Sequence, residues 1–599
     1  MAVIQNENWI RDVKFNLKEY LNIQQLFDLE AFEDFSWDDV DMMIDEAVKF
    51  SQEVLHPINV EGDKVGARLK DGKVVMPKSF HEAWEKFVEG SWGALPMNPE
   101  FGGGGLPFLA AAACTEFIQA SNPAFILFSG LSIGSGRLIE SFGTDELKEM
   151  FVEKMYTNEW TGSMCLTEPQ AGSDLGLVRT RAEKVGDKYK ITGSKIFITC
   201  GDHDMAENII HLVLARLDGA PEGTKGISLF AVPKYRVEAD GSVGEFNDVD
   251  VIGIEEKMGL HASPTCALEF GSKGNCFGYL VGKENEGMKQ MFQLMNEARM
   301  LVAMVSLALS TQAYDHSVEY AKERVQGPRL DNPKCGSVPI VQHEDVRRML
   351  MHMKAMTEGI RAMTYKASLM TDLENHAKTE EEREKAADLL AFLVPLCKSY
   401  ASDRVWELTR DAIQVHGGYG FTKEYPVEQL ARESKIQSIW EGSNYIQSLD
   451  LVGRKLPMKM GSVAQAFVED HMAFCATHES HELFKDEMAL LKKSSGLIGQ
   501  TMMQYSQWFG EGGIGKVGFT ATRFLDSIAE MTIAKCLLEQ ALIAESKRSD
   551  CSESDKEFYN TKIVTAKYFV TNVLPLSFSR LQTVLKGSQE VMDLPESAF

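Results

Sequence analysis

The sequence predicts a multidomain α+β protein with an N-terminal helical domain, a central antiparallel β-domain, a C-terminal helical bundle and a further helical extension. The 599 residues exceed what a single hydrophobic core organises. Helical spacing of apolar residues gives way near Gly162 to short strand-like runs, and it returns after Gly287. We therefore expect four domains, at residues 1–161, 162–286, 287–456 and 457–599.

The first domain shows helical spacing in WDDVDMMIDEAVKFSQEVL (37–55) and FGTDELKEMFVEKMY (142–156). The segment EFGGGGLP (100–107) interrupts this pattern. Its four glycines resemble a phosphate cradle, but no strand leads into them and no lysine follows. We expect a flexible connection between two helices there.

Four short runs rich in β-branched and aromatic residues predict the β-domain. Turn residues separate them, and no helices alternate with them, which argues against a doubly wound parallel sheet. The runs are KYKITGSKIFIT (188–199), NIIHLVLARL (208–217), KGISLFAVP (225–233) and PTCALEFG (264–271).

Three long helical segments predict the bundle, at residues 288–325, 343–370 and 381–416, the last bent at Pro395. The extension then contains GEGGIG (510–515), which has the letter spacing of a dinucleotide-binding loop. A helix-like stretch precedes it instead of a strand, so we expect a loop between two helices.

Composition excludes several classes of function. The net charge of −25 disfavours nucleic acid and anionic membrane surfaces as partners, because both attract basic proteins. The ten cysteines contain no CxxC pair and no metal-ligand spacing, which predicts reduced thiols and no metal site. The start lacks the features of a signal or transit peptide, and no apolar run reaches the length of a bilayer span. We expect a soluble, cytoplasmic protein.

A single carboxylate stands out in SIWEGSNYIQSLDLVGRKL (438–456). Glu441 follows Trp440 in a turn, and Ser443 and Asn444 are suitable N-cap residues for a helix from Tyr445 onward. Burial beside the indole would raise the pKa of this carboxyl and create a general base. The alternative is a charge that only favours the helix dipole.

Three segments together resemble the acyl-CoA dehydrogenase family: MCLTEPQAGSDL (164–175), QVHGGYGF (414–421) and IWEGSNYIQ (439–447). The resemblance covers residues 37 to 456. It is strongest to the longer members of the 3-methylmercaptopropionyl-CoA dehydrogenase type, which also carry a C-terminal extension.

The resemblance implies an FAD enzyme that oxidises the Cα–Cβ bond of an acyl-CoA thioester to the trans-2-enoyl-CoA. It makes Glu441 the base that removes the α-proton, while the β-hydrogen leaves as hydride to the flavin. The thioester oxygen would receive hydrogen bonds from the backbone N–H of Glu441 and from a ribityl hydroxyl. Gly442 would permit close approach of the substrate.

The resemblance also assigns further binding residues. Those expected at the CoA thioester, besides Gly442, are Ser173, Asn296 and Arg299, although most relatives have aspartate in place of Asn296. Those expected at FAD are Met164, Leu166, Thr167, Gly172, Ser173, Phe197, Ile198, Thr199, Arg324, Gln414, His416, Gly417, Gly418, Ser443 and Asn444.

In relatives the FAD site is shared between two subunits, which implies a homodimer here. The implied electron acceptor is an electron-transferring flavoprotein. One alternative is an acyl-CoA oxidase that uses oxygen, and another is a nucleic-acid-binding flavoprotein of the same fold. The acidic chain argues against the second alternative, and the identity of the acyl group stays open.

Overall fold

The computed structural model describes residues 6–599, and helices make up most of the N-terminal domain, which ends at residue 159. The capping box of Ser36 and Asp39 starts the first long helix, since each side chain bonds the backbone N–H of the other. The helices of this domain are α1 (Glu7–Phe15), α2 (Gln24–Phe27), α3 (Trp37–Phe50), α4 (His56–Val65), α5 (Lys78–Glu89), α6 (Phe108–Ser121), α7 (Pro123–Phe142) and α8 (Asp145–Tyr156). A small hairpin of β1 (Arg68–Lys70) and β2 (Lys73–Val75) interrupts them.

The glycine-rich segment between α5 and α6 is a compact turn, and the expectation of a flexible connection is wrong. The backbone N–H groups of Gly103, Gly104 and Gly105 bond carbonyls at Asn98, Ala94 and Met97 at 2.9–3.0 Å. A Cβ on Gly103 would lie 2.1 Å from the Met97 carbonyl oxygen, so the backbones of these two residues are in direct contact. Glycine is used here for close approach.

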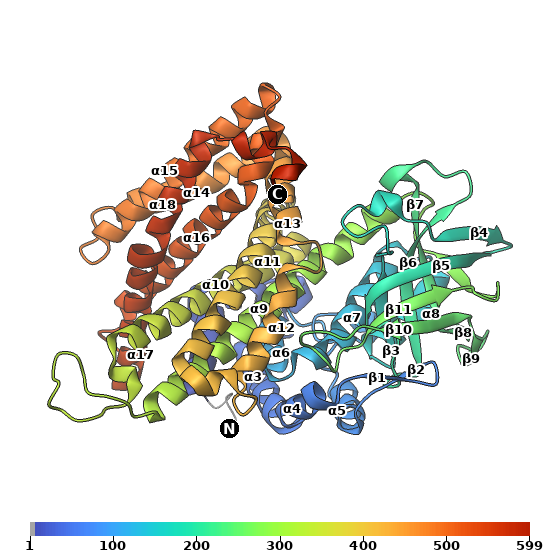
Figure 1. Cartoon of the computed structure of the whole chain (residues 1–599), viewed down its shortest axis with the longest axis horizontal. Helices are drawn as coiled ribbons and strands as arrows, with labels where there is room; N and C mark the ends of the chain where they lie inside the picture. Colours follow the sequence, from blue (N-terminus) through green and yellow to red (C-terminus); the bar gives the residue numbers. More distant parts are fainter. Residues whose placement is uncertain (1–5) are drawn as a thin grey trace.

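The β-domain is one eight-stranded sheet, which lies at the right of Figure 1. Its main path runs β10-β11-β5-β12-β7-β6-β3, and β4 pairs with β5 and β6. The strands are β3 (Trp160–Cys165), β4 (Arg181–Val185), β5 (Lys188–Thr199), β6 (Asn208–Leu217), β7 (Ile227–Pro233), β10 (Val249–Ile254), β11 (Thr265–Phe270) and β12 (Phe277–Leu280). The hairpin of β8 (Tyr235–Val237) and β9 (Val243–Phe246) lies beside it.

The sheet is mixed and not purely antiparallel as expected. Strand β6 pairs in parallel with β3 and with β4, while the other pairings are antiparallel. The strand β3 enters directly from α8, and the long segment between β3 and β6 allows the chain to return in the same direction.

The bundle is built on long helices: α9 (Gly287–Glu323), α10 (Glu344–His376), α11 (Glu380–His416), α12 (Val427–Ser434) and α13 (Asn444–Asp450). Helix α11 continues through Pro395. Within residues 6–599, α9 is the one helix long and apolar enough to cross a membrane, contrary to our expectation, but 61% of that stretch is buried inside the molecule. This burial identifies α9 as the core helix of the bundle.

The extension lies along one side of the bundle, as the orange and red helices at the upper left of Figure 1 show. It consists of α14 (Ser462–His478), α15 (Lys485–Gly510), α16 (Ile514–Lys547), α17 (Glu553–Tyr568) and α18 (Leu574–Lys586). The GEGGIG segment is the loop between α15 and α16, as expected. A Cβ on Gly359 of α10 would lie 2.3 Å from Cγ2 of Ile533 in α16, so the isoleucine side chain packs directly against the backbone of α10.

A buried ionic cluster joins the extension to the rest of the chain. Arg361 of α10 bonds Asp12 and Glu116 at 2.7 Å each, from α1 and α6. Lys562 of α17 bonds Asp12 at 2.7 Å and Glu358 of α10 at 2.8 Å. All five side chains are at most 5% exposed. One network of ion pairs therefore joins four helices that are far apart in the sequence, α1, α6, α10 and α17.

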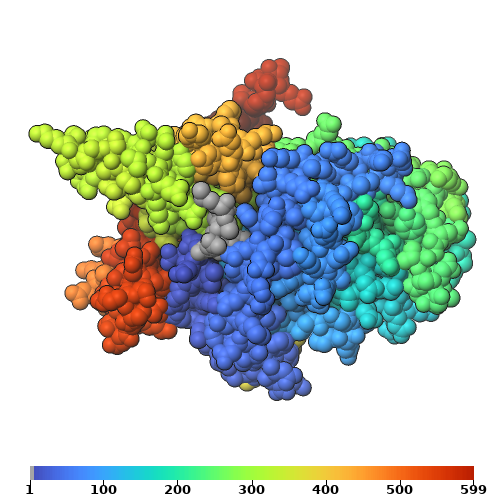
Figure 2. Space-filling model, turned by 90° about the horizontal axis from the view of Figure 1, so that it is seen from below, coloured from blue at the N-terminus to red at the C-terminus, as the bar shows by residue number. Residues whose placement is uncertain are grey.

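One segment projects from the body of the molecule. Residues 325–339 leave α9 as an exposed loop closed by an isolated bridge between Val325 and Pro339. The yellow-green extremity at the left of Figure 2 is this part of the chain.

Candidate active site

Glu441 lies in a turn whose backbone is unusual. Its φ is +52° and that of Gly442 is +77°, so two consecutive residues adopt left-handed conformations. Such a conformation costs a non-glycine residue about 1–2 kcal/mol. Gln447 of α13 supports the turn, because its Nε2 donates to the carbonyls of Glu441 at 3.3 Å and Gly442 at 3.1 Å.

The helix after the turn differs from the expectation. It begins at Asn444, ends at Asp450 and continues as a π-helical turn, Leu451–Lys455. Ser443 makes no side-chain capping bond. The Asn444 side chain instead accepts hydrogen bonds from Lys398 and Ser402 and donates to the Ser399 carbonyl. Tertiary contacts with α11 have replaced the local cap.

The carboxyl group of Glu441 is half-buried, and two cations influence it. Burial raises the pKa of Glu441 to about 7, while the charges of Lys398 and Arg299 act in the opposite direction. Trp440 precedes it and donates its Nε1 to Gln437 at 3.2 Å. A carboxyl with a pKa near neutrality can accept a proton and later release it.

Arg299 of α9 connects this helix to the end of α13. Its Nη1 donates to Asn296 at 3.3 Å and to Asp450 at 3.0 Å, and Asp450 also pairs with Arg454 at 2.7 Å. Arg299 is only 2% exposed, and its Nε and Nη2 have no partner within residues 6–599. A buried guanidinium with free donors is suited to an acceptor that the protein itself does not supply.

A cavity of about 660 Å³ lies between the N-terminal domain and the bundle. Its apolar wall includes Ile126 of α7, Leu301 and Met304 of α9, and Leu390 and Val394 of α11. This volume suits a small organic ligand. Asn296 lines the cavity and bonds Arg299, and Val394, another lining residue, lies one helical turn before Lys398.

Gln119 of α6 is a polar residue in the wall of this cavity. Its side chain is 0% exposed, yet neither Oε1 nor Nε2 has a hydrogen-bond partner within residues 6–599. An unpaired buried amide costs about 1–3 kcal/mol, so a ligand or water in the cavity is its natural partner.

The end of β3 and the loop after it hold the first group of expected FAD residues. Met164, Leu166 and Thr167 are half-buried, whereas Gly172 and Ser173 are exposed. A Cβ on Gly172 would meet nothing within 4 Å, which leaves open space on that side.

The ion pair of Glu168 and Lys195 anchors this loop to β5, and the sequence analysis identified neither residue. Lys195 of β5 pairs with Glu168 at 2.8 Å and donates to the Leu166 carbonyl at 3.0 Å. Glu168 also accepts from both the N–H and the hydroxyl of Thr180. Burial raises the pKa of Glu168, but Lys195 and these hydrogen bonds prevail and lower it to about 2, so the pair is ionised.

The C-terminal end of β5 holds the second group. Phe197 has a φ of +57° and is 58% exposed, so a large aromatic ring stands on the surface next to this loop. Thr199 is half-buried at the end of the strand. Ile198 is 2% exposed and packs into the core, so only its backbone is available to a ligand.

The third group lies at the other end of the bundle. Arg324 caps α9, its guanidinium lies 5.7 Å from the ring centre of Tyr419, and it lines a surface hollow together with His416, Gly417 and Gly418. The His416 ring stacks on Tyr320 at 4.3 Å, and burial lowers its pKa, so it is held neutral. Gln414, on the last turn of α11, is exposed. A Cβ on Gly417 or Gly418 would meet nothing within 4 Å.

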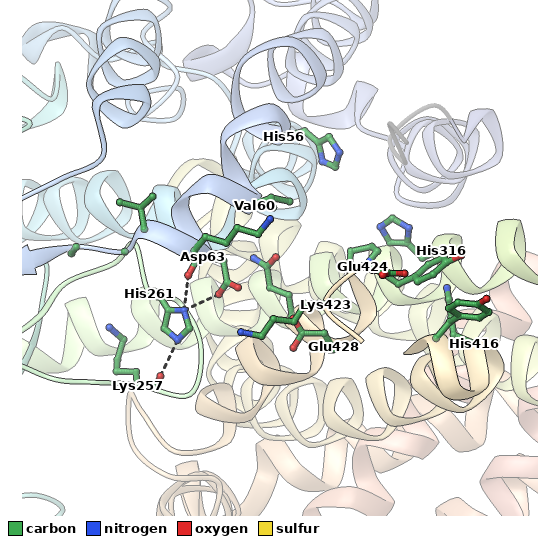
Figure 3. A pocket seen from close by; sticks show the side chains of 18 of the residues that line it. His56, Val60, Asp63, Lys257, His261, His316, His416, Lys423, Glu424 and Glu428 are labelled. Atoms are coloured by element: carbon green, nitrogen blue, oxygen red, sulfur yellow. Dashed lines mark hydrogen bonds and ion pairs between the residues drawn. The ribbon is translucent and has the colours of Figure 1, made fainter. Parts of the chain in front are cut away.

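A larger hollow of about 1660 Å³ adjoins this third group (Figure 3). His261 Nδ1 lies 2.9 Å from an Asp63 carboxylate oxygen at one end, and His316 and His416 lie at the other. Its lining includes Lys257 and His261 from the loop before β11 and Arg324 from the end of α9.

These residues fit an FAD molecule, the cofactor that the resemblance implies. The exposed Phe197 and the open side of Gly172 offer room for a flat ring, and Arg324 beside Gly417 and Gly418 offers a donor fork and accessible backbone for a diphosphate. Within residues 6–599, no group of three or more His, Cys, Asp or Glu residues could hold a metal ion.

Tyr445 is the second residue of α13. The structure directs its hydroxyl toward the extension, where a Cβ on Gly518 of α16 would lie 3.1 Å from it. The extension therefore contacts the helix that follows Glu441.

Comparison with known proteins agrees with this architecture. Family models match the chain in order as acyl-CoA dehydrogenase N-terminal domain (38–159), middle domain (163–272), C-terminal domain (285–456) and acetyl-CoA dehydrogenase C-terminal like (465–595). A butyryl-CoA dehydrogenase from Syntrophomonas wolfei is 39% identical over 606 residues, covering 98% of each chain. A 3-methylmercaptopropionyl-CoA dehydrogenase from Ruegeria pomeroyi is 40% identical over 461 residues, covering 77% of this chain and 78% of that protein.

A solved structure has the same fold over nearly the whole length. The acyl-CoA dehydrogenase from Bacillus anthracis, complexed with FAD, superposes with a TM-score of 0.73 at 21% identity, covering 93% of this chain and 90% of that one. The domain order, the matched family models and the full-length relatives lead to one conclusion. The chain belongs to the acyl-CoA dehydrogenase family, and it is an FAD-dependent oxidoreductase acting on acyl-CoA.

Proposed function

We propose that this enzyme converts a short-chain acyl-CoA to the trans-2-enoyl-CoA, with Glu441 as the base that removes the α-proton. The observation that carries the proposal is the carboxyl group in the left-handed turn, whose pKa burial raises to about 7. The named substrates of the two relatives, butyryl-CoA and 3-methylmercaptopropionyl-CoA, support a short acyl group.

The α-proton of a thioester is only weakly acidic, so its removal needs a base of matched pKa and a stabilised oxygen. A carboxylate with a pKa near 7 binds a proton more strongly than an ordinary carboxylate, and about half of it is still ionised at neutral pH. We propose the Glu441 backbone N–H as one donor to the thioester oxygen. FAD, when bound, supplies the acceptor for the β-hydrogen.

We place the acyl group in the 660 Å³ cavity between the N-terminal domain and the bundle. The aliphatic side chains of α9 and α11 exclude water from the Cα–Cβ bond, which strengthens the electrostatic interactions around it. Asn296 and Arg299 would contact the CoA portion near the cavity, with Ser173 on the loop of the β-domain.

We propose a homodimer with electron-transferring flavoprotein as the electron acceptor. Two regions carry the expected FAD residues, the loop and strand edge of the β-domain and the ends of α9 and α11, and this division supports a site completed by a second subunit. A cytoplasmic location is proposed as well, because none of the ten cysteines is in a disulfide and eight are buried.

The variant Glu441→Gln tests the base. It should retain bound flavin and bind acyl-CoA, yet lose turnover by roughly 10²–10⁴-fold, because the amide cannot accept the proton. Flavin bleaching by butyryl-CoA in a stopped-flow instrument measures this step directly. Near-normal bleaching at matched flavin content would refute the assignment.

Glu433→Gln is a matched control. Burial also raises the pKa of Glu433 to about 7, but this carboxyl bonds Gln429 within α12. This variant should bleach at the wild-type rate. If both variants lose activity equally, burial of a carboxyl and not proton abstraction is the common cause.

The acceptor is tested separately. The enzyme is reduced by substrate without oxygen and then mixed with air or with electron-transferring flavoprotein. Slow reoxidation in air and fast reoxidation by the flavoprotein support the dehydrogenase, whereas rapid peroxide release indicates an oxidase.

A further inference from the structure

The turn that carries Glu441 is held by a lysine from a distant part of the sequence. Lys398 of α11 is 0% exposed, and its Nζ donates to the Gly442 carbonyl and to Asn444 Oδ1, both at 2.9 Å. Ser399 and Ser402 bond the same asparagine at 3.1 and 3.0 Å. One face of α11 thus fixes residues 442–444 at three points.

This ammonium group is unusual because its direct partners are neutral. Within residues 6–599, Lys398 forms no ion pair, and its two hydrogen-bond acceptors are a carbonyl and an amide oxygen. A buried charge without a carboxylate partner is costly to keep. A neutral donor such as glutamine could make the same hydrogen bonds, so the charge itself calls for an explanation.

The carboxylate that benefits from this charge is Glu441. Lys398 and Arg299 are the two cations that act on Glu441, from α11 and α9 respectively. Arg299 already pairs with Asp450, which also binds Arg454. Asp403, one turn further along α11, is the other acid that acts on Lys398. Lys398 is therefore the cation near Glu441 that has no direct carboxylate partner of its own.

We propose that Lys398 is a positioning residue for the proposed base, holding the Glu441–Asn444 turn by hydrogen bonds and favouring the ionised carboxylate by its charge. This inference rests on the proposed role of Glu441. The electrostatics agree with it. Burial lowers the pKa of Lys398 to about 7, with Glu441 opposing that shift, and burial raises the pKa of Glu441 to about 7, with Lys398 opposing it. Each group stabilises the charged form of the other.

The test compares Lys398→Gln, Lys398→Arg and wild type in the FAD-loaded enzyme. The measurement is the rate of flavin bleaching by butyryl-CoA between about pH 5.5 and 9, together with KM for the substrate. Glutamine keeps a hydrogen-bond donor and removes the charge, whereas arginine keeps the charge.

Lys398→Gln should lower the bleaching rate roughly 10- to 100-fold at pH 7, a loss typical of a misplaced or mistuned catalytic group. The acidic limb of its pH–rate profile should move to higher pH, because without the cation the carboxyl group of Glu441 releases its proton only at higher pH. Lys398→Arg should keep the limb of the wild type and recover part of the rate. KM should change little in both variants.

Lys435→Gln is the matched control, since this lysine precedes the same turn and, among the residues that the structure describes, its Nζ donates only to the nearby Ser438 hydroxyl, at 3.1 Å. Its acidic limb should stay in place. A Lys398→Gln enzyme with a wild-type pH profile and rate would overturn the proposal, and so would an equal shift in the Lys435 control.

The outcome separates this inference from the function on which it rests. If Glu441→Gln is inactive and Lys398→Gln behaves as wild type, only the role of the lysine is wrong. If Glu441→Gln remains active, the base itself is misassigned and both proposals fall. If Lys398→Gln does not fold, Lys398→Arg alone decides. The proposal then requires that this variant keep partial activity and the acidic limb of the wild-type pH–rate profile.

Discussion

Lys562 provides the most direct way to test how the extension is attached. Its ammonium lies between Asp12 and Glu358, at 2.7 and 2.8 Å, and it is 2% exposed. In Lys562→Met, each carboxylate keeps one other cation, Arg361 for Asp12 and Lys354 for Glu358. Breaking a buried ion pair from one side costs about 3–5 kcal/mol.

This free energy should appear as easier local opening of α17. A loss of about 3–5 kcal/mol corresponds to a 10²-fold or greater increase in hydrogen exchange of amides that exchange by this opening. Exchange measured by mass spectrometry on peptides within 553–568 reports it without the assumption of two-state unfolding. The exposed Lys556, which pairs with Glu553 at 3.4 Å, supplies the control variant Lys556→Met, for which little change is expected.

The same substitution has a pH signature. The cations around Asp12 outweigh its burial and lower its pKa to about 2, from an ordinary value of 3.8. The resulting stability is present above pH about 4 and is lost as the pH falls toward 2. Without Lys562 the folded-state pKa rises, so acid-induced opening should begin at higher pH. Unchanged exchange in α17, at neutral and at acidic pH, would show that the cluster does not hold the extension.

The remaining predictions concern the cavity and the turn. Gln119→Leu removes the unpaired amide from the cavity wall and should raise the unfolding temperature in a thermal scan, reflecting about 1–3 kcal/mol of relieved desolvation; an unchanged or lower temperature would mean that water already satisfies this side chain. Gly442→Ala should lower turnover about tenfold, because the turn needs a φ of +77° and the new Cβ would lie 3.0 Å from Gln447 Nε2. Gly72→Ala, at a φ of +75° with nothing within 4 Å, carries the same backbone strain and should leave turnover unchanged.

Local patterns predicted much of the fold. The runs at 188–199 and 208–217 are β5 and β6, and the long helices begin and end close to the expected residues, because periodicity and capping are encoded within a few residues. The parallel pairing of β3 with β6 was not predicted, since it depends on how the chain returns from the N-terminal domain. The tight glycine turn was misinterpreted because its hydrogen-bond partners lie outside the glycines themselves.

The candidate site was predicted in part for the same reason. The turn with Glu441 and the loop after β3 are continuous in sequence, so a resemblance finds them. Lys398 lies 44 residues before Gly442 in the middle of an apolar helix, and Lys195 lies 27 residues after Glu168 within a strand. Only the folded chain brings such partners together, and in the sequence each is one lysine among many.

Helix α9 has a further consequence. It is 37 residues long, about 55 Å at 1.5 Å per residue. It runs without a break from the cavity residues Asn296 and Leu301 to its C-cap Arg324, which lines the surface hollow. One residue inserted between these points would rotate one end by about 100° relative to the other. The orientation of the side chains at one end of α9 about the helix axis therefore fixes their orientation at the other end. We expect α9 to tolerate substitutions far more readily than insertions or deletions.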